Sequence, residues 1–256
     1  IVSPERPVAG RGAPRRRESS CEHFTEEAER GVMDGELPEG VRRIDCGRVN
    51  AYLVEDDDAL TLVDAGMPGC ADAIRNAVGD EGYTIRDLDR VLLTHYDVDH
   101  VGALAKLTPA LDADVVASRE TAAMLLGERA PPLTNRKGLL QRVSRVLIST
   151  PDLPIVHVEH EAPVGTFTAY HTPGHTPGHV VYVSERRDVA FLGDLIHESC
   201  GDLVPSKWLV SYDTGEVRAS IKSLAAQAPF FEYACPGHGE PLGDGYGRLE
   251  RLAERL

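Results

Sequence analysis

The stretch THYDVDHVG, residues 94–102, decides how the rest of this sequence is interpreted. It follows the apolar run RVLL (90–93), which predicts a buried strand, and precedes ALAKL (103–107), which predicts a helix. Four side chains that can bind a metal ion fall within six residues: His95, Asp97, Asp99 and His100. Imidazole and carboxylate groups suit zinc, iron and manganese. A polar loop with a capped helix is the alternative interpretation of such a cluster.

Three further residues favour a metal site over a polar loop. His175, Asp194 and His238 each stand at the end of a predicted strand. Sheets with helices outside them bind ligands beyond the strand ends, so these side chains are expected at one edge with residues 95–100. The sequence therefore predicts a site that is assembled from both halves of the chain.

Apolar runs and turn residues predict strands and helices that alternate in two halves. The strands are expected at 41–54, 60–63, 90–94, 113–117, 155–159, 166–171, 180–183, 189–192 and 230–235. The helices are expected at 71–78, 103–107, from Ser118 onward, within 128–149, and at 220–228 and 246–256. The basic helical stretch within 128–149 is either a solvated face or an insertion that covers a substrate.

The length of 256 residues predicts one domain with a sizeable core. Residues 1–32 are rich in Arg, Pro, Gly and Ser, which predicts a disordered tail, and residues 33–256 are expected to form the domain. Met33 is a candidate initiator. The sequence lacks the apolar run of about 18 residues that a membrane span needs and an apolar secretion signal, so neither is expected.

Charge and cysteine content narrow the class of protein further. The formal net charge of −14, with 41 acidic and 27 basic residues, argues against binding to nucleic acid. Five cysteines without a CxxC motif predict no disulfide scaffold and a cytoplasmic location. Cys200 and Cys235 follow site elements, so each is either a buried apolar side chain or part of the site lining. No pattern in the sequence indicates an oligomeric state.

Five short motifs occur in order between residues 41 and 240: DAG (64–66), THYDVDH (94–100), PGHT (173–176), GD (193–194) and PGHG (236–239). Together they resemble the motifs of the metallo-β-lactamase fold superfamily. The resemblance implies an α/β fold, a four-layer αβ/βα sandwich, with a dinuclear metal site at its edge. It also implies the ligands: His95, Asp97 and His175 for the first ion, Asp99, His100 and His238 for the second, and Asp194 as the bridge.

One residue departs from the HxHxDH pattern that is common in this family, because Asp97 stands where a histidine is usual. Hydrolytic members mostly have histidine there, whereas flavodiiron oxygen and nitric oxide reductases have glutamate and use iron. A harder oxygen ligand moves the preference from zinc towards iron or manganese. Aspartate is shorter than glutamate, so Asp97 is either a direct ligand or a group outside the ligand shell.

The resemblance implies a dinuclear metal-dependent hydrolase of the glyoxalase II-like or lactonase-like type, which cleaves a thioester, ester or lactone of a small molecule. Two divalent ions are the expected cofactors, with zinc favoured over iron or manganese. Paired cations lower the pKa of a shared water towards ~7, which provides hydroxide for hydrolysis at neutral pH. Asp99 is expected to be catalytic as well as a ligand, by orienting the nucleophile or passing on a proton. Lys207 and Arg142 are either contacts for an anionic substrate group or solvated charges.

Three further residues in or near the motifs are expected to support the ligands or to hold turns. Asp64 follows a predicted strand and is expected to hold a turn and a ligand imidazole, whose tautomer needs a hydrogen-bonded partner. His171 and His179 are expected to be turn or supporting residues.

A redox enzyme with one or two iron ions, of the oxygen reductase or persulfide dioxygenase type, is the alternative function. Asp97 favours it. The lack of a flavodoxin-like domain disfavours the flavodiiron version, and a single iron would leave several candidate ligands unexplained. A non-catalytic scaffold is disfavoured by the presence of Asp194 and His238, and a nuclease is disfavoured by the acidic charge.

Overall fold

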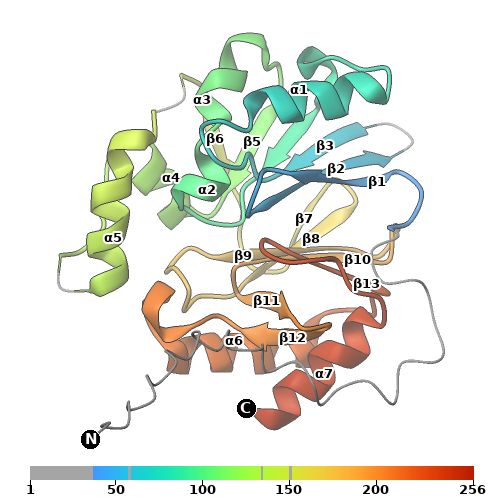
Figure 1. The fold of residues 1–256 in the computed structure, drawn as a ribbon, viewed down its shortest axis with the longest axis vertical. Helices are drawn as coiled ribbons and strands as arrows, with labels where there is room; N and C mark the ends of the chain where they lie inside the picture. The colour runs from blue at the N-terminus through green and yellow to red at the C-terminus, as the bar shows by residue number, and fades with distance from the viewer. Residues whose placement is uncertain (1–36, 57–58, 134, 150–151) are drawn as a thin grey trace, which may run out of the picture. The chain divides into compact units, whose positions relative to one another are not determined.

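The computed structural model describes residues 37–56, 59–133, 135–149 and 152–256, and the predicted disordered tail, residues 1–32, lies outside them. Within residues 37–256, two β-sheets lie face to face and helices cover the outer face of each (Figure 1). This arrangement is a four-layer αβ/βα sandwich, which confirms the predicted fold class.

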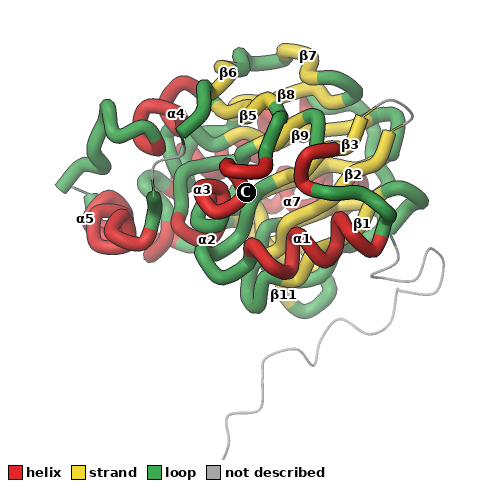
Figure 2. Tube along the Cα trace, turned by 90° about the horizontal axis from the view of Figure 1, so that it is seen from above, coloured by secondary structure: helices red, strands yellow, loops and turns green. Residues whose placement is uncertain are grey.

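The first sheet has six strands in the order β1 to β6, of which β1, β2 and β3 are antiparallel and β3 to β6 are parallel. The strands are β1 (Val41–Asp45), β2 (Asn50–Asp56), β3 (Ala59–Val63), β4 (Arg90–Leu92), β5 (Asp114–Ala117) and β6 (Ile155–His157). The helices beside it are α1 (Ala71–Asp80), α2 (Val98–Val101), α3 (Leu104–Leu107) and α4 (Arg119–Leu125), with the short 3-10 helices η1 (Ile85–Asp87) and η2 (Thr108–Ala110). Figure 2 shows α1, α2 and α3 in front of the strands.

The second sheet has five strands in the order β13-β10-β9-β8-β7, and β11 pairs with β12 in a separate ribbon. The strands are β7 (Ala162–Val164), β8 (Phe167–His171), β9 (Val180–Ser184), β10 (Val189–Gly193), β11 (Ile196–Ser199), β12 (Asp202–Pro205) and β13 (Tyr233–Pro236). The helices α6 (Thr214–Gln227) and α7 (Gly245–Arg255) cover its outer face (Figure 1). The helix α5 (Arg136–Ser144), followed by η3 (Arg145–Leu147), stands at one end of the sandwich, and η4 (Trp208–Val210) precedes α6.

Three apolar cores separate the four layers. Between the sheets, Tyr52 and Leu92 of the first sheet pack in one cluster with Tyr182 and Phe191 of the second. The outer clusters join α1 and α3 to the first sheet, and α6 and α7 to the second sheet. Every residue of β9 and β10 is buried, because both faces of these strands are covered by other layers. Their first four residues, VVYV and VAFL, accordingly form continuous apolar runs.

Strand direction brings the candidate site residues to one edge. β3 and β4 are parallel, so the loops that follow them leave the first sheet at the same edge. In the second sheet, β8 and β10 are each antiparallel to β9, and β13 is parallel to β10, so β8, β10 and β13 run in the same direction. The loops after these five strands contain the five sequence motifs.

The structure differs from the predicted elements in several places. The run 41–54 forms two strands, because residues 46–49 turn the chain between β1 and β2. The short strands β7, β11 and β12 were not predicted. The helix α6 begins six residues before the predicted start, because the Asp213 side chain accepts hydrogen bonds from the backbone of Gly215 and Glu216. Ser118 caps α4 as predicted.

The prediction of no disulfide is wrong. Cys46 and Cys70 form a disulfide that joins the β1–β2 turn to the start of α1, with 5.3 Å between their Cα atoms, and Cys200 is disulfide-bonded as well. Cys235 is a free thiol buried between the sheets, where burial raises its pKa, so it packs in the core. None of the described helices has both the length and the apolar character that a membrane span requires.

Candidate metal centre

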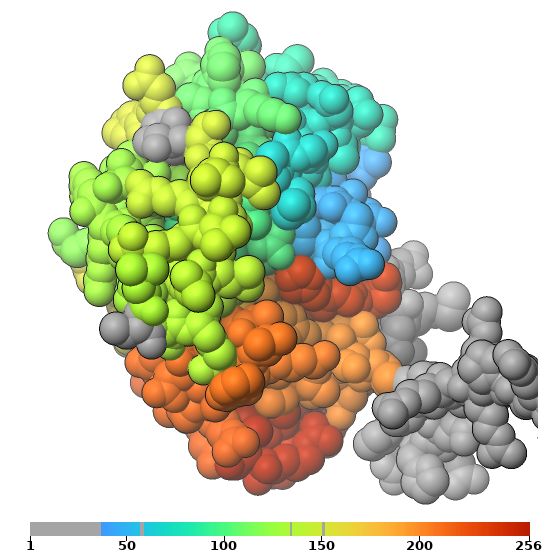
Figure 3. Space-filling model, turned by 60° about the vertical axis from the view of Figure 1, so that its left-hand side comes forward, coloured from blue at the N-terminus to red at the C-terminus, as the bar shows by residue number. Residues whose placement is uncertain are grey.

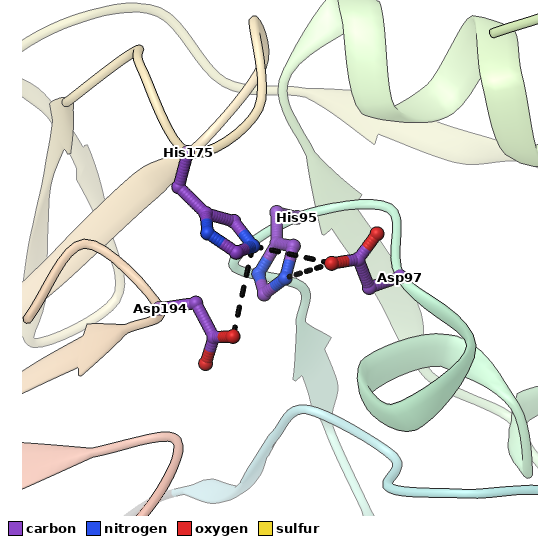
Figure 4. Close-up of side chains that lie close together, drawn as sticks. All are labelled: His95, Asp97, His175 and Asp194. Atoms are coloured by element: carbon purple, nitrogen blue, oxygen red, sulfur yellow. Dashed lines mark hydrogen bonds and ion pairs between the residues drawn. The ribbon is translucent and has the colours of Figure 1, made fainter. Parts of the chain in front are cut away.

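All seven predicted ligand residues lie together where the five loops meet. They form two groups, and within each group the candidate ligand atoms lie within 4.8 Å of one another. We define the first site as His95, Asp97, His175 and Asp194 (Figure 4), and the second site as Asp99, His100 and His238. Asp194 contacts both, since its Oδ2 lies 3.6 Å from His175 Nε2 and 3.3 Å from His238 Nε2.

The junction between β4 and α2 determines where the ligands of the central motif point. Asp97 is the N-cap residue of α2, with φ −131°, but its side chain accepts no hydrogen bond from the helix backbone. An N-cap aspartate usually makes that bond. Here the carboxylate turns into the first site, while Asp99 and His100 lie in the first turn of α2 and contact residues of the second site.

Asp64 orients both histidines of the motif from the loop after β3. The Thr94 hydroxyl donates to Asp64 Oδ2 over 2.7 Å and therefore accepts from His95 Nδ1, 3.0 Å away. His100 Nδ1 lies 2.7 Å from Asp64 Oδ2 and donates to it. Both rings thereby direct Nε2 into the site, which confirms the supporting role predicted for Asp64.

The histidines from the second sheet are held in the same way. His175 Nδ1 lies 2.8 Å from Ser206 Oγ, and His238 Nδ1 donates to the carbonyl of Arg48. His179 Nε2 accepts the Asp194 N–H over 3.1 Å, so His179 positions the bridging residue, as the prediction of a supporting role implies. A Cβ at Gly237 would lie 2.6 Å from Asp194 Oδ1, so the close packing at this point requires glycine.

The second site contains buried polar atoms without partners. His100 Nε2 and Asp194 Oδ1 lie 3.2 Å apart and make no hydrogen bond to each other or to any other described group. Two buried polar atoms that face each other without a hydrogen bond are costly unless a proton or a metal cation lies between them. Asp99 Oδ2, 3.5 Å from His238 Nε2, adds a carboxylate at the same place. The donor set of the second site, together with Asp194, therefore fits a divalent metal ion.

The first site already contains a cation from the chain itself. His95 Nε2 and His175 Nε2 lie 3.3 and 3.1 Å from Asp97 Oδ2, spacings that would suit metal ligands. However, Lys137 Nζ of α5 donates to Asp97 Oδ2 and lies 3.2 Å from His175 Nε2. Gln141, one turn further along α5, donates to Asp97 Oδ1 over 2.7 Å.

The pKa values in the first site reflect the buried lysine. Burial disfavours the ionised form of Asp97, but the Lys137 charge and the adjacent His175 and His95 rings outweigh it, so its pKa lies well below the usual value. Burial and the Lys137 charge together lower the pKa of His175 to about 3. His175 is therefore neutral, and its Nε2 is an acceptor.

The carboxylates of the second site favour positive charge. Burial disfavours protonation of His100, yet Asp194 and Asp64 raise its pKa well above the usual value. Burial opposes protonation of His238 as well, but Asp194 and Asp99 raise its pKa to about 10. Despite burial, His238 and His100 lower the pKa of Asp99, so this carboxylate is ionised. The same field attracts a metal cation.

A pocket of about 470 Å³ opens beside the second site. Asp99 and His238, whose side chains are 31% and 29% exposed, lie in its wall. The remaining lining residues come from the β1–β2 turn and the loop after β3: Cys46, Gly47, Arg48, Val49 and Met67. A larger hollow of about 800 Å³, lined by Arg42 and Arg187 among others, contains none of the candidate ligands.

The sequence interpretation included Lys137 only as part of a basic stretch, and Gln141 was missed. Arg142 donates to the carbonyl of Pro131, and Lys207 is exposed, so neither contacts the candidate ligands. The Nε2 atom of His171 lies 3.0 Å from the carbonyl of Val158, and no described contact joins His171 to a candidate ligand, so a supporting role for this residue stays a prediction.

Comparison with known proteins identifies the family. The family model of the metallo-β-lactamase superfamily matches residues 44–238, and the chain belongs to this superfamily. The "probable metallo-hydrolase YybB" of Bacillus subtilis (strain 168) is 29% identical over 195 residues, 76% of this chain and 82% of that protein.

Two other similar proteins bear on the chemistry. The hydroxyacylglutathione hydrolase of Rhodopseudomonas palustris (strain BisB18) is 32% identical over 125 residues, 47% of this chain and 46% of that protein. The protein TTHA1623, solved as a crystal structure in a di-iron-bound form, is 29% identical, with a TM-score of 0.62 over 86% of this chain and 100% of that chain.

Proposed function

We propose that this protein is a metal-dependent hydrolase that cleaves a thioester, ester or lactone bond in a small molecule. The observation that carries the proposal is the second site, where two buried ligand atoms lie 3.2 Å apart without a hydrogen bond, next to a pocket. Membership of the superfamily and similarity to proteins named as hydrolases support it.

The residues of the second site have separable roles in such a reaction. A divalent ion held by Asp99, His100, His238 and Asp194 would supply a water that ionises near neutral pH and would polarise the scissile carbonyl. Asp99 is ionised and faces the pocket, so its carboxylate is placed to accept a proton there. Asp64 and the Arg48 carbonyl keep the imidazoles of His100 and His238 in the required tautomers.

The pocket wall indicates the kind of substrate. Met67, which is 38% exposed, offers apolar surface to an acyl chain, and the exposed Arg48 offers a positive charge to a carboxylate. An acyl compound with an acidic group fits this wall better than a nucleic acid, since the chain carries a net charge of −14.

An iron-dependent redox reaction is the second candidate, because TTHA1623 was solved with two iron ions. The sequence favours iron only through Asp97, as an oxygen ligand. This argument is weakened because the Asp97 carboxylate bonds to Lys137. Zinc or manganese in the second site therefore remains our first choice.

The cytoplasmic location predicted from the cysteines remains a prediction. The Cys46–Cys70 disulfide removes its main support, because disulfides persist mainly in oxidising compartments.

Hydrolysis of an acyl thioester, an aryl ester and a γ-lactone by the full chain tests the proposal. We expect turnover of at least one class, loss of turnover on chelation, and recovery with zinc or manganese. Asp99→Asn should reduce the rate by about 100-fold or more, in line with loss of a proton-transfer group. Iron content with oxygen uptake, and no hydrolysis of any ester class, would instead favour the redox candidate.

A further inference from the structure

We propose that the Lys137 ammonium takes the place of a metal ion in the first site, so that the chain binds a single divalent ion, in the second site. This inference rests on the proposed metal-dependent function. It concerns the number and location of the ions, and it holds for any substrate.

The helix α5 delivers Lys137 to the first site on a well-anchored backbone. The Lys137 side chain is 5% exposed, although lysine is among the residues most rarely buried. Arg136 at the start of α5 stacks on Trp208, with its guanidinium carbon 3.7 Å from the ring centre, and donates to the Trp208 carbonyl. Figure 3 shows the yellow-green surface of this segment against the orange surface that includes η4.

A metal ion and Lys137 compete for the same lone pair. A neutral imidazole has one unprotonated nitrogen, and we assign it to His175 Nε2 because this atom faces the donor-only Lys137 Nζ, which leaves Nδ1 to donate to Ser206 Oγ. Lys137 Nζ, which can only donate, uses this lone pair over 3.2 Å. A metal ion bound to His175 would need the same lone pair along the same direction, so the two arrangements exclude each other.

Both oxygens of Asp97 are also engaged by α5. Lys137 bonds to Oδ2 and Gln141 to Oδ1, and the Gln141 amide also donates to the Tyr96 carbonyl over 2.8 Å. The Tyr212 hydroxyl donates to the Gln141 carbonyl oxygen over 2.5 Å and fixes the amide orientation. By contrast, two of the three buried side-chain atoms that lack partners among the described residues are candidate ligand atoms, His100 Nε2 and Asp194 Oδ1, and they lie 3.2 Å apart at the second site.

Charge balance explains the aspartate at position 97. A buried ammonium requires a carboxylate partner, which a histidine at this position would not provide. A divalent ion in the first site would stand beside the Lys137 ammonium and be repelled by it. Asp97 and Lys137 thus form a matched pair that neutralises the site without a metal.

Counting bound ions tests the proposal directly. The full chain is equilibrated with excess zinc, freed of unbound zinc, and analysed by native mass spectrometry and elemental analysis. We expect one zinc ion per wild-type chain and two per chain for Lys137→Met, which keeps the length of the side chain but removes its charge. The matched control is Lys222→Met on the exposed face of α6, which should bind one ion.

Circular dichroism verifies that each variant is folded, and the ion counts then separate the outcomes. Two ions on the wild-type chain would overturn the proposal even if Lys137→Met did not fold, and one ion on folded Lys137→Met would also overturn it. One ion without hydrolysis of any ester class would support the proposal and reject the hydrolase function.

Discussion

The first and second sites use similar ligands, yet their surroundings differ. In the first site, Lys137 and Gln141 of α5 bond to Asp97, and Lys137 also contacts His175. In the second site, His100 Nε2 and Asp194 Oδ1 are buried without a hydrogen-bond partner. We infer from this difference that a ligand motif indicates where a cation is held, while residues distant in the sequence decide whether that cation is a metal ion or a side chain.

Removal of a candidate ligand of the second site should reduce metal binding and hydrolysis more than any other change. We expect His100→Ala to lose the bound ion and to reduce hydrolysis by more than the roughly 10–100-fold that loss of an outer partner costs. Elemental analysis and the ester assay measure both. The control is His171→Ala, since the His171 ring contacts the Val158 carbonyl and none of the candidate ligands. Retention of the ion by His100→Ala would mean that the first site is the metal-binding one, which would invert the comparison.

Replacement of Asp64, whose carboxylate orients His100, should reduce zinc affinity less than the loss of His100 itself. Asp64→Asn should weaken zinc binding by about 10–100-fold, because the amide is a poorer acceptor for the His100 Nδ1–H. Asp64 has φ +59°, and asparagine tolerates this left-handed conformation, so the turn should persist. Competition with a chromogenic chelator measures the affinity. Asp188→Asn, at an exposed residue with φ +52°, controls for the conformation itself and should leave the affinity unchanged.

Weakening the contact between α5 and Trp208 should have the smallest effect. It should increase local opening of α5 beside the first site and leave the second site unchanged. Arg136→Ala removes a cation–π contact with Trp208 that is worth about 0.5–1 kcal/mol at an exposed position. Hydrogen exchange of the amides of residues 138–144 should become up to about fivefold faster, while the zinc affinity of the second site stays constant. A matching loss of zinc affinity would show that the two sites are not independent.

Most of the fold was predictable because the inner strands are buried on both faces and form continuous apolar runs, such as VVYV (180–183). The ends of elements were less predictable. α6 begins at Thr214 because of the Asp213 cap, and β11 and β12 are four-residue strands whose only partners are each other. Local hydrogen bonds determine where these elements begin and end, and such bonds cannot be predicted from hydrophobic periodicity.

The clustering of the seven candidate ligand residues was predictable because each is part of a short motif at a strand end. Lys137 was not, because α5 inverts the usual amphipathic pattern. It buries Lys137 and Gln141 and leaves Leu139 and Leu140 exposed by 51% and 54%. The one available signal was Asp97 itself, a carboxylate in a histidine position whose charge requires a partner. The disulfide was missed because Cys46 and Cys70 are 24 residues apart and belong to no motif.

The candidate ligands come from loops of both sheets, and this arrangement has a consequence for how the chain unfolds. Asp99 and His100 follow β4 of the first sheet, whereas Asp194 and His238 follow strands of the second. A metal ion bound to all four would link the two halves, so its binding free energy would oppose the separation of either half. Calorimetry should then show a higher transition temperature for the metal-loaded protein than for the metal-free protein.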